Sequence, residues 1–484
     1  MYKIIDGSTQ GLADLERFVE TLGQVSAEAA IGFDPRREVF ITRAPGRLDV
    51  MGGIADYSGS LVLQLPVSEA AIVALQPDPS PELTIVSVDV TGGRRCRLTP
   101  LSLLFPGGNP IECEAARRYF ERDPSESWAA YIAGAFLVLS REVGARFNRG
   151  ARILVASSVP EGKGVSSSAA LEVASMEAVA AAFDIQVQPR EMALLCQKVE
   201  NHIVGAPCGV MDQMTAVCGE AGRLLALLCQ PADVLGTIGV PPSMGLWGLD
   251  SGVRHFVSGA DYGSVRTGAF MGYRMICDIA GLDVRETDAG LAIDDSRWGG
   301  YLANVTPREF ESEFASGLPE RMKGSEFLSR YGAITDTATR IKADRTYPVL
   351  AATAHPIYEH TRVQKFAELL RDESNDPTVH RLVSLGELMY ESHASYSACG
   401  LGADGTDLLV KLVQEAGPAA GLYGGKITGG GSGGTVAVLG ASDARESVEA
   451  VAEKYEQATG VRPHIFEGSS PGSTAVGFLR VVGD

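Results

Sequence analysis

Apolar and polar positions in the first half of the chain follow two different periods. Short apolar or alternating runs are typical of strands, and apolar positions three and four residues apart are typical of helices. The pattern predicts strands at residues 38–42, 61–65, 70–75, 83–88 and 151–156. It predicts helices at residues 12–22, 128–143, 168–183 and 189–202. We therefore expect residues 1–35 to form a helical leader and residues 36–240 to form a first domain.

The second half repeats this mixture of elements. The pattern predicts a strand at residues 245–250 and helices at residues 262–279, 363–371, 383–392 and 442–459. Residues 282–347 have weak periodicity and mixed charge, so we expect an insertion or a cap there. We expect residues 241–484 to form a second domain that carries this insertion.

Glycine and serine gather in three segments, at residues 45–60, 159–170 and 428–435. The middle segment runs directly into an alanine-rich helical pattern, so the unpaired N–H groups and the dipole of that helix would attract anions. Its candidate phosphate-binding residues are Gly162, Lys163, Gly164, Val165, Ser166, Ser167 and Ser168. Three such segments in one chain indicate phosphate chemistry.

Two common nucleotide-binding signatures do not fit these segments. A Walker loop needs glycine five residues before Gly162, where this chain has Ser157. Gly429, Gly431 and Gly434 match the spacing of the dinucleotide fingerprint, but they precede an apolar run instead of opening a helix. We therefore expect a phosphate loop of another kind.

Charge and composition narrow the possible partners. A formal net charge of −18 over 484 residues argues against a nucleic acid or an anionic membrane as the partner. No apolar run is long enough for a membrane span, and the eight scattered cysteines are typical of reduced thiols. We expect a cytoplasmic enzyme whose partners are small molecules, and the oligomeric state stays open.

The glycine-rich segments carry a family resemblance. The chain resembles the GHMP kinase superfamily in its three motifs, which correspond in order to residues 43–57, 160–170 and 426–434. A fourth segment, residues 200–213, is similar to the segment that holds the catalytic base of galactokinases. The resemblance runs from about residue 39 to residue 480. It implies an α+β fold of two main domains, with the active site in the cleft between them.

The resemblance also implies roles for individual residues. Asp212 would accept the proton of a sugar hydroxyl, and Arg47 would keep Asp212 ionised and stabilise charge on the transferred group. ATP would bind the middle segment and Gly430 and Gly431, and Mg²⁺ would bind Ser168 and Glu200, since Mg²⁺ prefers few carboxylates together with phosphate oxygens and water. Each residue also has a purely structural interpretation: a helix cap for Asp212, an ion pair for Arg47 and an exposed lysine for Lys163.

The sugar-binding residues would be Gly53, Ile54, Ala55, Asp56 and Tyr262. Galactokinases carry a Glu-His pair where this chain has Gly53-Ile54, and that pair helps to hold the C6 hydroxymethyl of the hexose. L-Arabinopyranose has the galactose hydroxyl pattern without C6, so a pocket that lacks the pair favours this pentose. Residues 49–59 are most similar to the L-arabinose-phosphorylating branch of the family. A change of packing alone is the alternative explanation of Gly53-Ile54, and a pocket adapted to a pentose is preferred.

We therefore expect an ATP- and Mg²⁺-dependent kinase that converts L-arabinose to L-arabinose 1-phosphate. Two alternatives stay open. The substrate could be galactose or galacturonate, although residues 53–55 offer no cationic group for a C6 carboxylate. The chain could also be a sugar- and ATP-binding sensor without turnover, against which the joint presence of Asp212, Arg47, Ser168 and Glu200 argues.

Overall fold

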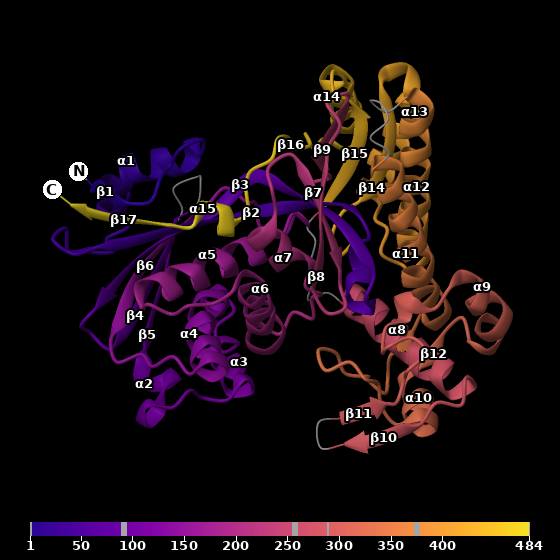
Figure 1. Ribbon diagram of the computed structural model, residues 1–484, viewed down its shortest axis with the longest axis horizontal. Helices are drawn as coiled ribbons and strands as arrows, with labels where there is room; N and C mark the ends of the chain where they lie inside the picture. The colour runs from indigo at the N-terminus through magenta and orange to yellow at the C-terminus, as the bar shows by residue number, and fades with distance from the viewer. Residues whose placement is uncertain (1, 89–93, 254–259, 288–289, 372–377, 484) are drawn as a thin grey trace.

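The computed structural model describes residues 2–88, 94–253, 260–287, 290–371 and 378–483. In these residues most of the strands belong to two sheets, which lie side by side in Figure 1. The larger sheet has nine strands, and seven of them follow the order β1-β17-β2-β3-β6-β4-β5. Strand β7 pairs with another part of β3, and β8 pairs with β7. These strands are β1 (Tyr2–Asp6), β2 (Val39–Met51), β3 (Leu61–Asp78), β4 (Glu82–Val88), β5 (Arg94–Pro100), β6 (Gly150–Ser157), β7 (Arg223–Leu228), β8 (Asp233–Gly239) and β17 (Phe478–Gly483).

Both ends of the chain belong to the larger sheet. Strand β1 pairs antiparallel with β17, so that Tyr2 lies opposite Gly483, and β17 also pairs with β2. The two termini consequently lie next to each other at the left of Figure 1. The first part of the expected helical leader is therefore a strand, and the last residues of the chain complete the sheet built by the first part.

Helices cover both faces of the larger sheet. Helix α1 (Ala13–Glu28) packs on one face, and the other face carries α4, α5, α6 and α7. These elements, with the short helices near them, are α2 (Leu101–Leu104), α3 (Cys113–Phe120), α4 (Ala130–Val143), α5 (Ser167–Ala182), α6 (Pro189–Lys198), the π-helical turn η4 (Val199–Val204), α7 (Met211–Cys218) and α15 (Ser473–Val476). Small side chains on α5 allow close packing, and Thr42 Oγ1 on β2 donates to the carbonyl of Ala174 at 2.6 Å.

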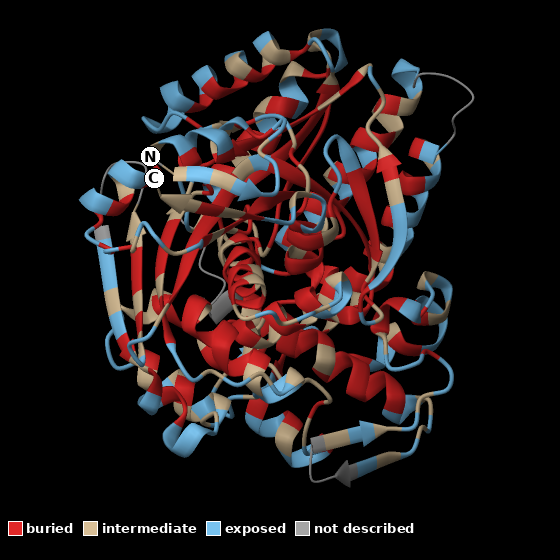
Figure 2. Ribbon diagram, turned by 60° about the vertical axis from the view of Figure 1, so that its left-hand side comes forward, coloured by how far each residue is buried: buried red, intermediate tan, exposed pale blue. Residues whose placement is uncertain are grey.

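The second sheet has the strand order β14-β15-β9-β16. Its strands are β9 (Met244–Asp250), β14 (Leu422–Ile427), β15 (Thr435–Ala441) and β16 (Ile465–Phe466). Alternate residues of β15 face opposite sides: Ala437 and Leu439 pack with α11 (Val349–Arg371) and α12 (Val379–Ala398), whereas Val436 and Val438 pack with α13 (Asp404–Ala416) and α14 (Arg445–Thr459). Figure 2 shows buried residues on both sheets and on the helix sides that face them.

Helix α12 lies unusually close to this sheet. A Cβ atom at Gly386 would lie 1.9 Å from the carbonyl oxygen of Tyr423, so that only glycine fits at this contact. The apolar cluster under α11 and α12 also includes side chains from β2, β3 and β7. This shared core joins the two sheets and positions the loops between them.

Residues 282–347 form a small unit on α8 (Ala260–Ile279) and α11, at the lower right of Figure 1. Its aromatic side chains pack together, with Trp298 edge-on to Phe314. The unit contains β10 (Val284–Thr287), β11 (Gly290–Ile293), η5 (Leu302–Asn304), α9 (Pro307–Glu309), η6 (Phe310–Phe314), η7 (Ala315–Gly317), β12 (Met322–Lys323), α10 (Gly324–Tyr331) and β13 (Thr346–Tyr347). The residues expected to form an insertion or a cap are therefore folded, and they share one apolar cluster with α8 and α11.

One prediction for the larger sheet is wrong. The two strands expected at residues 61–65 and 70–75 are a single strand, β3. Pro66 and the polar residues after it interrupt the apolar pattern, and proline lacks the N–H that a strand normally donates. The sheet accommodates Pro66 because the register of β2 shifts between Pro45 and Arg47, opposite this point.

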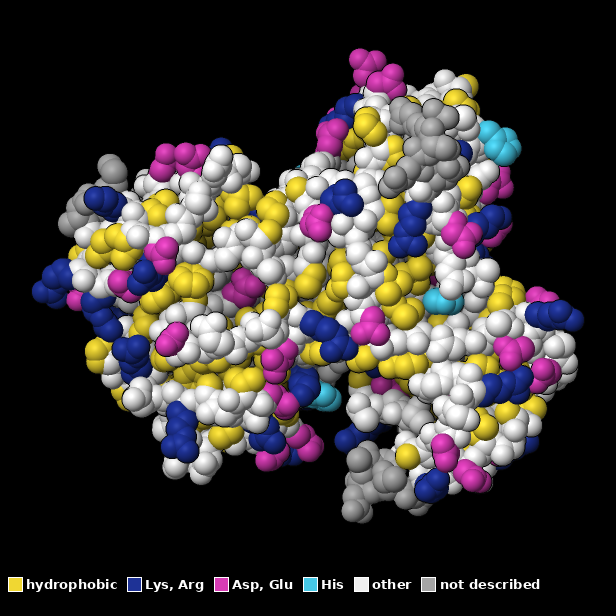
Figure 3. All heavy atoms as spheres, viewed as in Figure 1, with side chains coloured by type: hydrophobic (Ala, Val, Ile, Leu, Met, Phe, Trp, Pro, Cys, Tyr) yellow, Lys and Arg dark blue, Asp and Glu magenta, His cyan; other side chains and the backbone are white. Residues whose placement is uncertain are grey.

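Across the described ranges, no helix is both long enough and apolar enough to cross a bilayer. On the face shown in Figure 3, acidic and basic side chains are interspersed.

Candidate active site

The middle glycine-rich segment forms the loop between β6 and α5. Gly162 and Gly164 have φ values of +71° and +72°, and Ser166, which precedes the first turn of α5, has a φ of +61°. A left-handed serine is uncommon and strained, and such strain gathers at functional sites. The loop thus delivers the N-terminus of α5 and its serine hydroxyls to one point, as the sequence predicts.

The third glycine-rich segment packs directly against this loop. Thr435 Oγ1 donates to the carbonyl of Lys163 at 2.8 Å. A Cβ atom at Gly434 would lie 2.9 Å from the same carbonyl oxygen, so the two backbones approach closely because residue 434 is glycine. The Lys163 ammonium group lies 2.7 Å from a carboxylate oxygen of Asp250, at the end of β9. The loop lysine is therefore paired with the second sheet, and Gly430 and Gly431 lie in the adjoining turn.

Arg47 and Asp212 form a two-pronged ion pair beside the glycine-rich loop between β6 and α5. Arg47 Nε and Nη2 donate to the two carboxylate oxygens of Asp212 at 2.9 and 3.0 Å, and Nη1 donates to the carbonyl of Gly164 at 2.6 Å. The Ser166 hydroxyl also donates to Asp212. The Asp212 side chain is 18% exposed and that of Arg47 is 3% exposed, so the carboxylate is the accessible member of the pair.

Asp56 lies near Asp212 on the short 3₁₀ helix η1 (Gly53–Ser58). Burial and the charge of Asp212 raise the pKa of Asp56 to about 7, while the Arg266 guanidinium opposes this shift. A Cβ atom at Gly209 would lie 1.7 Å from a carboxylate oxygen of Asp56, which explains the glycine in that loop. Two close carboxylates, one buried and one partly exposed, can accept hydrogen bonds from a polyhydroxylated ligand.

The tyrosine predicted to contact a sugar belongs to the same cluster. Tyr262, on α8, packs edge-on to Tyr57 with ring centroids 6.0 Å apart. Both phenols are buried, and burial raises the pKa of each well above its usual value. The structure therefore brings Asp56 and Tyr262 together, and their contact with a sugar stays a prediction.

The segment expected to shape the sugar pocket is buried. Gly53, Ile54 and Ala55 are almost inaccessible, and the hydroxyl of Tyr396 on α12 accepts a hydrogen bond from the N–H of Ile54 at 2.8 Å. The same hydroxyl donates to the carbonyl of Gly429 at 3.0 Å. A Cβ atom at Gly53 would lie 1.5 Å from the hydroxyl oxygen of Tyr396, so packing against Tyr396 is one sufficient reason for the glycine.

Glu200 lies on η4 in a corner rich in carboxylates. Burial, together with the charge of Asp212, raises the pKa of Glu200 to about 7, and a hydrogen bond with Ser168 opposes the shift. Gln213 Nε2 donates to Glu200 at 2.6 Å and to Glu172 at 3.1 Å. The Glu172 Oε1 atom is buried without a hydrogen-bond partner, and burial with the charge of Glu200 raises the pKa of Glu172 well above its usual value.

This corner fits a cation that takes few ligands from the protein. Carboxylate and hydroxyl oxygens are the donors that Mg²⁺ prefers, and a cation would offset the negative charge shared by Glu200, Glu172 and Asp212. No set of three or more His, Cys, Asp or Glu side chains in the described ranges is arranged as a complete metal site. A Mg²⁺ ion here would therefore take further ligands from phosphate and water.

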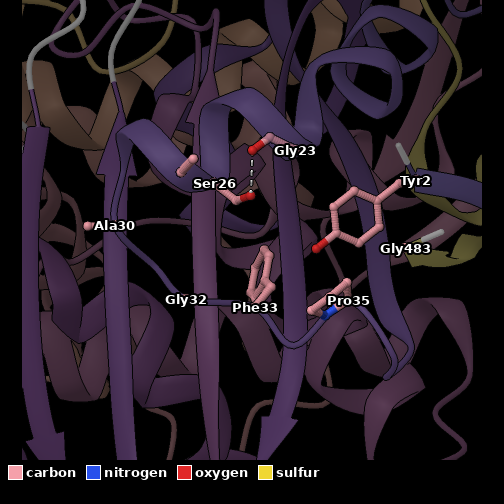
Figure 4. Close-up of a pocket in the computed structure, with 9 residues that line it drawn as sticks. Tyr2, Gly23, Ser26, Ala30, Gly32, Phe33, Pro35 and Gly483 are labelled. Carbon is pink, nitrogen blue, oxygen red and sulfur yellow. Dashed lines mark hydrogen bonds between the residues drawn. The ribbon is translucent and has the colours of Figure 1, made fainter.

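A separate pocket of about 610 Å³ lies between α1 and the chain ends (Figure 4). Its lining is apolar or neutral, and it includes none of the predicted site residues. The lining residues are Tyr2, Gly23, Ser26, Ala27, Ala30, Gly32, Phe33, Pro35 and Gly483. The chemistry therefore gathers around Asp212 and not in this pocket.

Comparison with known proteins finds the two domains of one kinase family. Residues 130–220 match the GHMP kinases N terminal domain, and residues 366–457 match the GHMP kinases C terminal domain. The chain therefore contains segments that match both GHMP kinase domains. The first match contains the phosphate loop, Glu200 and Asp212, and the second contains the third glycine-rich segment.

Several proteins are similar to this chain over nearly its whole length. An L-arabinokinase of Arabidopsis thaliana is 45% identical over 99% of the chain and 52% of that protein, so the chain spans about half the length of this relative. A galactokinase of Chloroflexus aggregans is 29% identical over 90% of the chain and 91% of that protein. Lactococcus lactis galactokinase, solved with galactose, has a TM-score of 0.68 at 19% identity and covers 94% of the chain and 99% of its own. Its likeness confirms the expected GHMP kinase fold.

Some residues of the candidate site were not predicted from the sequence. Lys426 and Asp49 form an ion pair at 2.6 Å with both side chains fully buried, joining β14 to β2. Asp49 Oδ1 also accepts the N–H of Gly53 at 3.0 Å and so holds the start of η1. Lys426 and Asp49 both lie inside the segments that resemble the family motifs, and this position was the one sequence signal that they belong to the site. Glu172 carried only the weaker signal of a carboxylate four residues after Ser168 on the same helix.

Proposed function

We propose that this chain is an ATP- and Mg²⁺-dependent sugar 1-kinase that forms L-arabinose 1-phosphate and ADP from L-arabinose. The observation that carries the proposal is the Arg47–Asp212 pair, whose carboxylate touches the phosphate-loop serine Ser166 and lies close to the buried carboxylate of Asp56. A base located between an anion-binding loop and a hydroxyl-binding pocket fits transfer of a phosphoryl group to a sugar hydroxyl.

In the proposed mechanism Asp212 acts on the anomeric hydroxyl. Its carboxylate accepts the hydroxyl proton while the sugar oxygen forms a bond to the γ-phosphorus and the bond between that phosphorus and the ADP oxygen breaks. Ser166 and Arg47 hold the carboxylate, so proton transfer needs little rearrangement. Asp56 and Tyr262 would fix the orientation of the sugar through its ring hydroxyls.

Arg47 has two functions in this proposal. Its Nε and Nη2 atoms hold the two carboxylate oxygens of Asp212, and its hydrogen bond to the Gly164 carbonyl ties the base to the glycine-rich loop. Ser168 and Glu200 would hold Mg²⁺, which supplies Lewis-acid stabilisation of the charge on the transferring phosphoryl group. Catalysis would rest mainly on positioning and electrostatic stabilisation.

The proposed substrate depends on sequence similarity and on residues 53–55. Among the relatives described above, the Arabidopsis L-arabinokinase has the higher identity, and the galactokinase supports the alternative substrate. The Gly53-Ile54 segment offers no side-chain hydrogen-bond partner to a C6 hydroxyl, which supports a pentose. We further propose that the enzyme is cytoplasmic and that its partners are the sugar and ATP.

The test is an ADP-release assay with L-arabinose, D-galactose and D-galacturonate, each with and without Mg²⁺. We expect release with L-arabinose that depends on Mg²⁺ and is lost in the Asp212→Asn variant. Preferential release with D-galactose would replace L-arabinose with the galactokinase alternative. Release with none of the sugars, together with calorimetric binding of ATP and L-arabinose, would favour the sensor.

A further inference from the structure

Arg266 connects the proposed sugar site with the inserted unit. Tyr262, Arg266 and Phe270 are spaced four residues apart on α8 and therefore share one face of the helix. The guanidinium carbon lies 5.3 Å from the ring centre of Tyr57 and 5.7 Å from that of Phe270. Its charge acts on Asp56, the neighbour of Tyr57, and favours the ionised carboxylate. Arg266 is thus buried directly behind the candidate sugar-binding turn.

The guanidinium group makes two sets of hydrogen bonds. Nη1 donates to the carbonyl of Cys208 at 2.9 Å and to that of Pro207 at 3.4 Å, in the loop that leads to Asp212. Nε and Nη2 donate to the two carboxylate oxygens of Asp336 at 2.9 and 2.8 Å. One side of the group therefore holds the loop before the base, and the other side is held by Asp336.

Asp336 comes from the inserted unit at residues 282–347 and is itself firmly held. Its carboxylate also accepts the Thr339 hydroxyl at 2.6 Å and the N–H of Ala338 at 3.1 Å. The side chains of Asp336 and Arg266 are 4% and 8% exposed, so water cannot replace either partner. A two-pronged pair of this kind fixes the plane of the guanidinium group as well as its position.

We propose that Asp336 is a positioning residue of the sugar site, through which the inserted unit sets the affinity for the sugar. The proposal rests on the proposed function. By occupying the Nε and Nη2 edge of Arg266, Asp336 keeps that edge from pairing with Asp56. Without Asp336 the guanidinium would turn towards Asp56, another carboxylate whose charge acts on it, and occupy the oxygen atoms that sugar hydroxyls would otherwise use.

The test compares two substitutions that remove one carboxylate charge each. Asp336→Asn removes the partner of Arg266 with little change in size. Asp295→Asn is the matched control, because Asp295 also belongs to the inserted unit and also bonds to α8, through the hydroxyl of Tyr273 two turns beyond Arg266. Both variants loosen the contact between the unit and α8, but only Asp336→Asn frees Arg266.

We expect Asp336→Asn to raise the KM for L-arabinose about tenfold or more, as loss of charge-assisted hydrogen bonds to a ligand would. The kcat and the KM for ATP should change by less than about threefold, and Asp295→Asn should keep the KM for L-arabinose near the unmodified value. An unchanged KM for L-arabinose in Asp336→Asn would overturn the proposal. The proposal would also be overturned if both variants changed the KM for L-arabinose, the kcat and the KM for ATP to the same extent. That result would indicate a structural role only.

Two further measurements decide the remaining cases. If Asp336→Asn does not fold, Thr339→Ala removes one hydrogen bond to Asp336 and should raise the KM for L-arabinose alone, by a smaller factor; an unchanged KM would refute the proposal. If the unmodified protein phosphorylates no sugar, the proposed function fails by itself. Hydrogen exchange then tests the positioning role: the amides of residues 205–211 should exchange faster in Asp336→Asn than in Asp295→Asn, and equal rates would reject it.

Discussion

The contact between Gly53 and Tyr396 gives a sharp test of the site's architecture. In a Gly53→Ala variant the new Cβ atom would lie 1.5 Å from the Tyr396 hydroxyl oxygen and 2.7 Å from its ring carbon Cζ. Tyr396 is fully buried and cannot move aside without losing its hydrogen bonds to Ile54 and Gly429. The φ of +45° at Gly53 adds strain for any residue with a side chain.

The magnitude follows from these three effects. Overpacking of a core costs about 1–3 kcal/mol, the two hydrogen bonds contribute about 1 kcal/mol each, and the left-handed backbone costs about 1 kcal/mol. If one or both hydrogen bonds are lost, Gly53→Ala should lower the free energy of unfolding by about 3–6 kcal/mol. The measurement is urea denaturation monitored by circular dichroism, from which the midpoint and the free energy of unfolding are obtained.

Tyr396→Phe provides the matched control, because it removes the oxygen atom and leaves the ring. Alone it should cost about 1–2 kcal/mol, since the N–H of Ile54 loses its partner. Combined with Gly53→Ala it should cost about 2 kcal/mol less than the sum of the two single variants. A Gly53→Ala variant as stable as the unmodified protein, or strict additivity in the double variant, would refute the packing explanation.

This contact also affects how substrate choice can be tested. A glutamate at position 53, as galactokinases carry, would collide with Tyr396 whatever sugar the enzyme uses. Substituting Glu-His for Gly53-Ile54 would therefore disturb the fold together with the pocket. Comparing sugars in the unmodified enzyme separates the two explanations better.

The remaining predictions address chemistry, metal, substrate and pH. Asp212→Asn should lower kcat about a hundredfold or more with sugar binding retained by calorimetry; near-normal turnover in a folded variant would remove this residue from the mechanism. Glu200→Gln and Ser168→Ala should each raise the Mg²⁺ concentration for half-maximal activity about tenfold or more, and an unchanged requirement in both would contradict the assignment. L-Arabinose should exceed D-galactose in kcat/KM by at least about tenfold, whereas equal values would favour a broad galactokinase. Burial raises the pKa of Glu177 to about 8, against a hydrogen bond from Ser473, so stability should fall as the pH rises from the unfolded pKa near 4.5 to about 8. Glu177→Gln should flatten this decline in urea midpoints measured at pH 5 and pH 8; an equal decline in both proteins would exclude Glu177 as its source.

Local patterns in the sequence predicted the elements that depend on neighbouring residues. The strand, glycine-rich loop and alanine-rich helix around residues 151–183 correspond to β6, the phosphate loop and α5. Each of these depends on interactions within a few residues, such as apolar periodicity, left-handed glycines and a helix N-terminus. The family resemblance then placed Arg47, Asp212 and Glu200 in one site, because the order of its motifs implies a fold. The domain division after residue 240 stays a prediction.

The tertiary structure alone decided the contacts between segments that lie far apart in the chain. Tyr396 lies 342 residues from Ile54, Asp336 lies 70 residues from Arg266, and Lys426 lies 377 residues from Asp49. Such contacts leave no periodic signal, because each depends on how two surfaces meet after the sheets and helices have packed. The sequence by itself therefore determined the glycine-rich loop between β6 and α5 and the resemblance to GHMP kinases, since these follow from local geometry and motif order, while the roles of the loop and of Asp212 stay predictions. Only the packed structure showed that Tyr396 leaves no room for a side chain at residue 53 and that Asp336 reaches Arg266, because excluded volume and buried charge pairing act between segments that meet only in the folded chain.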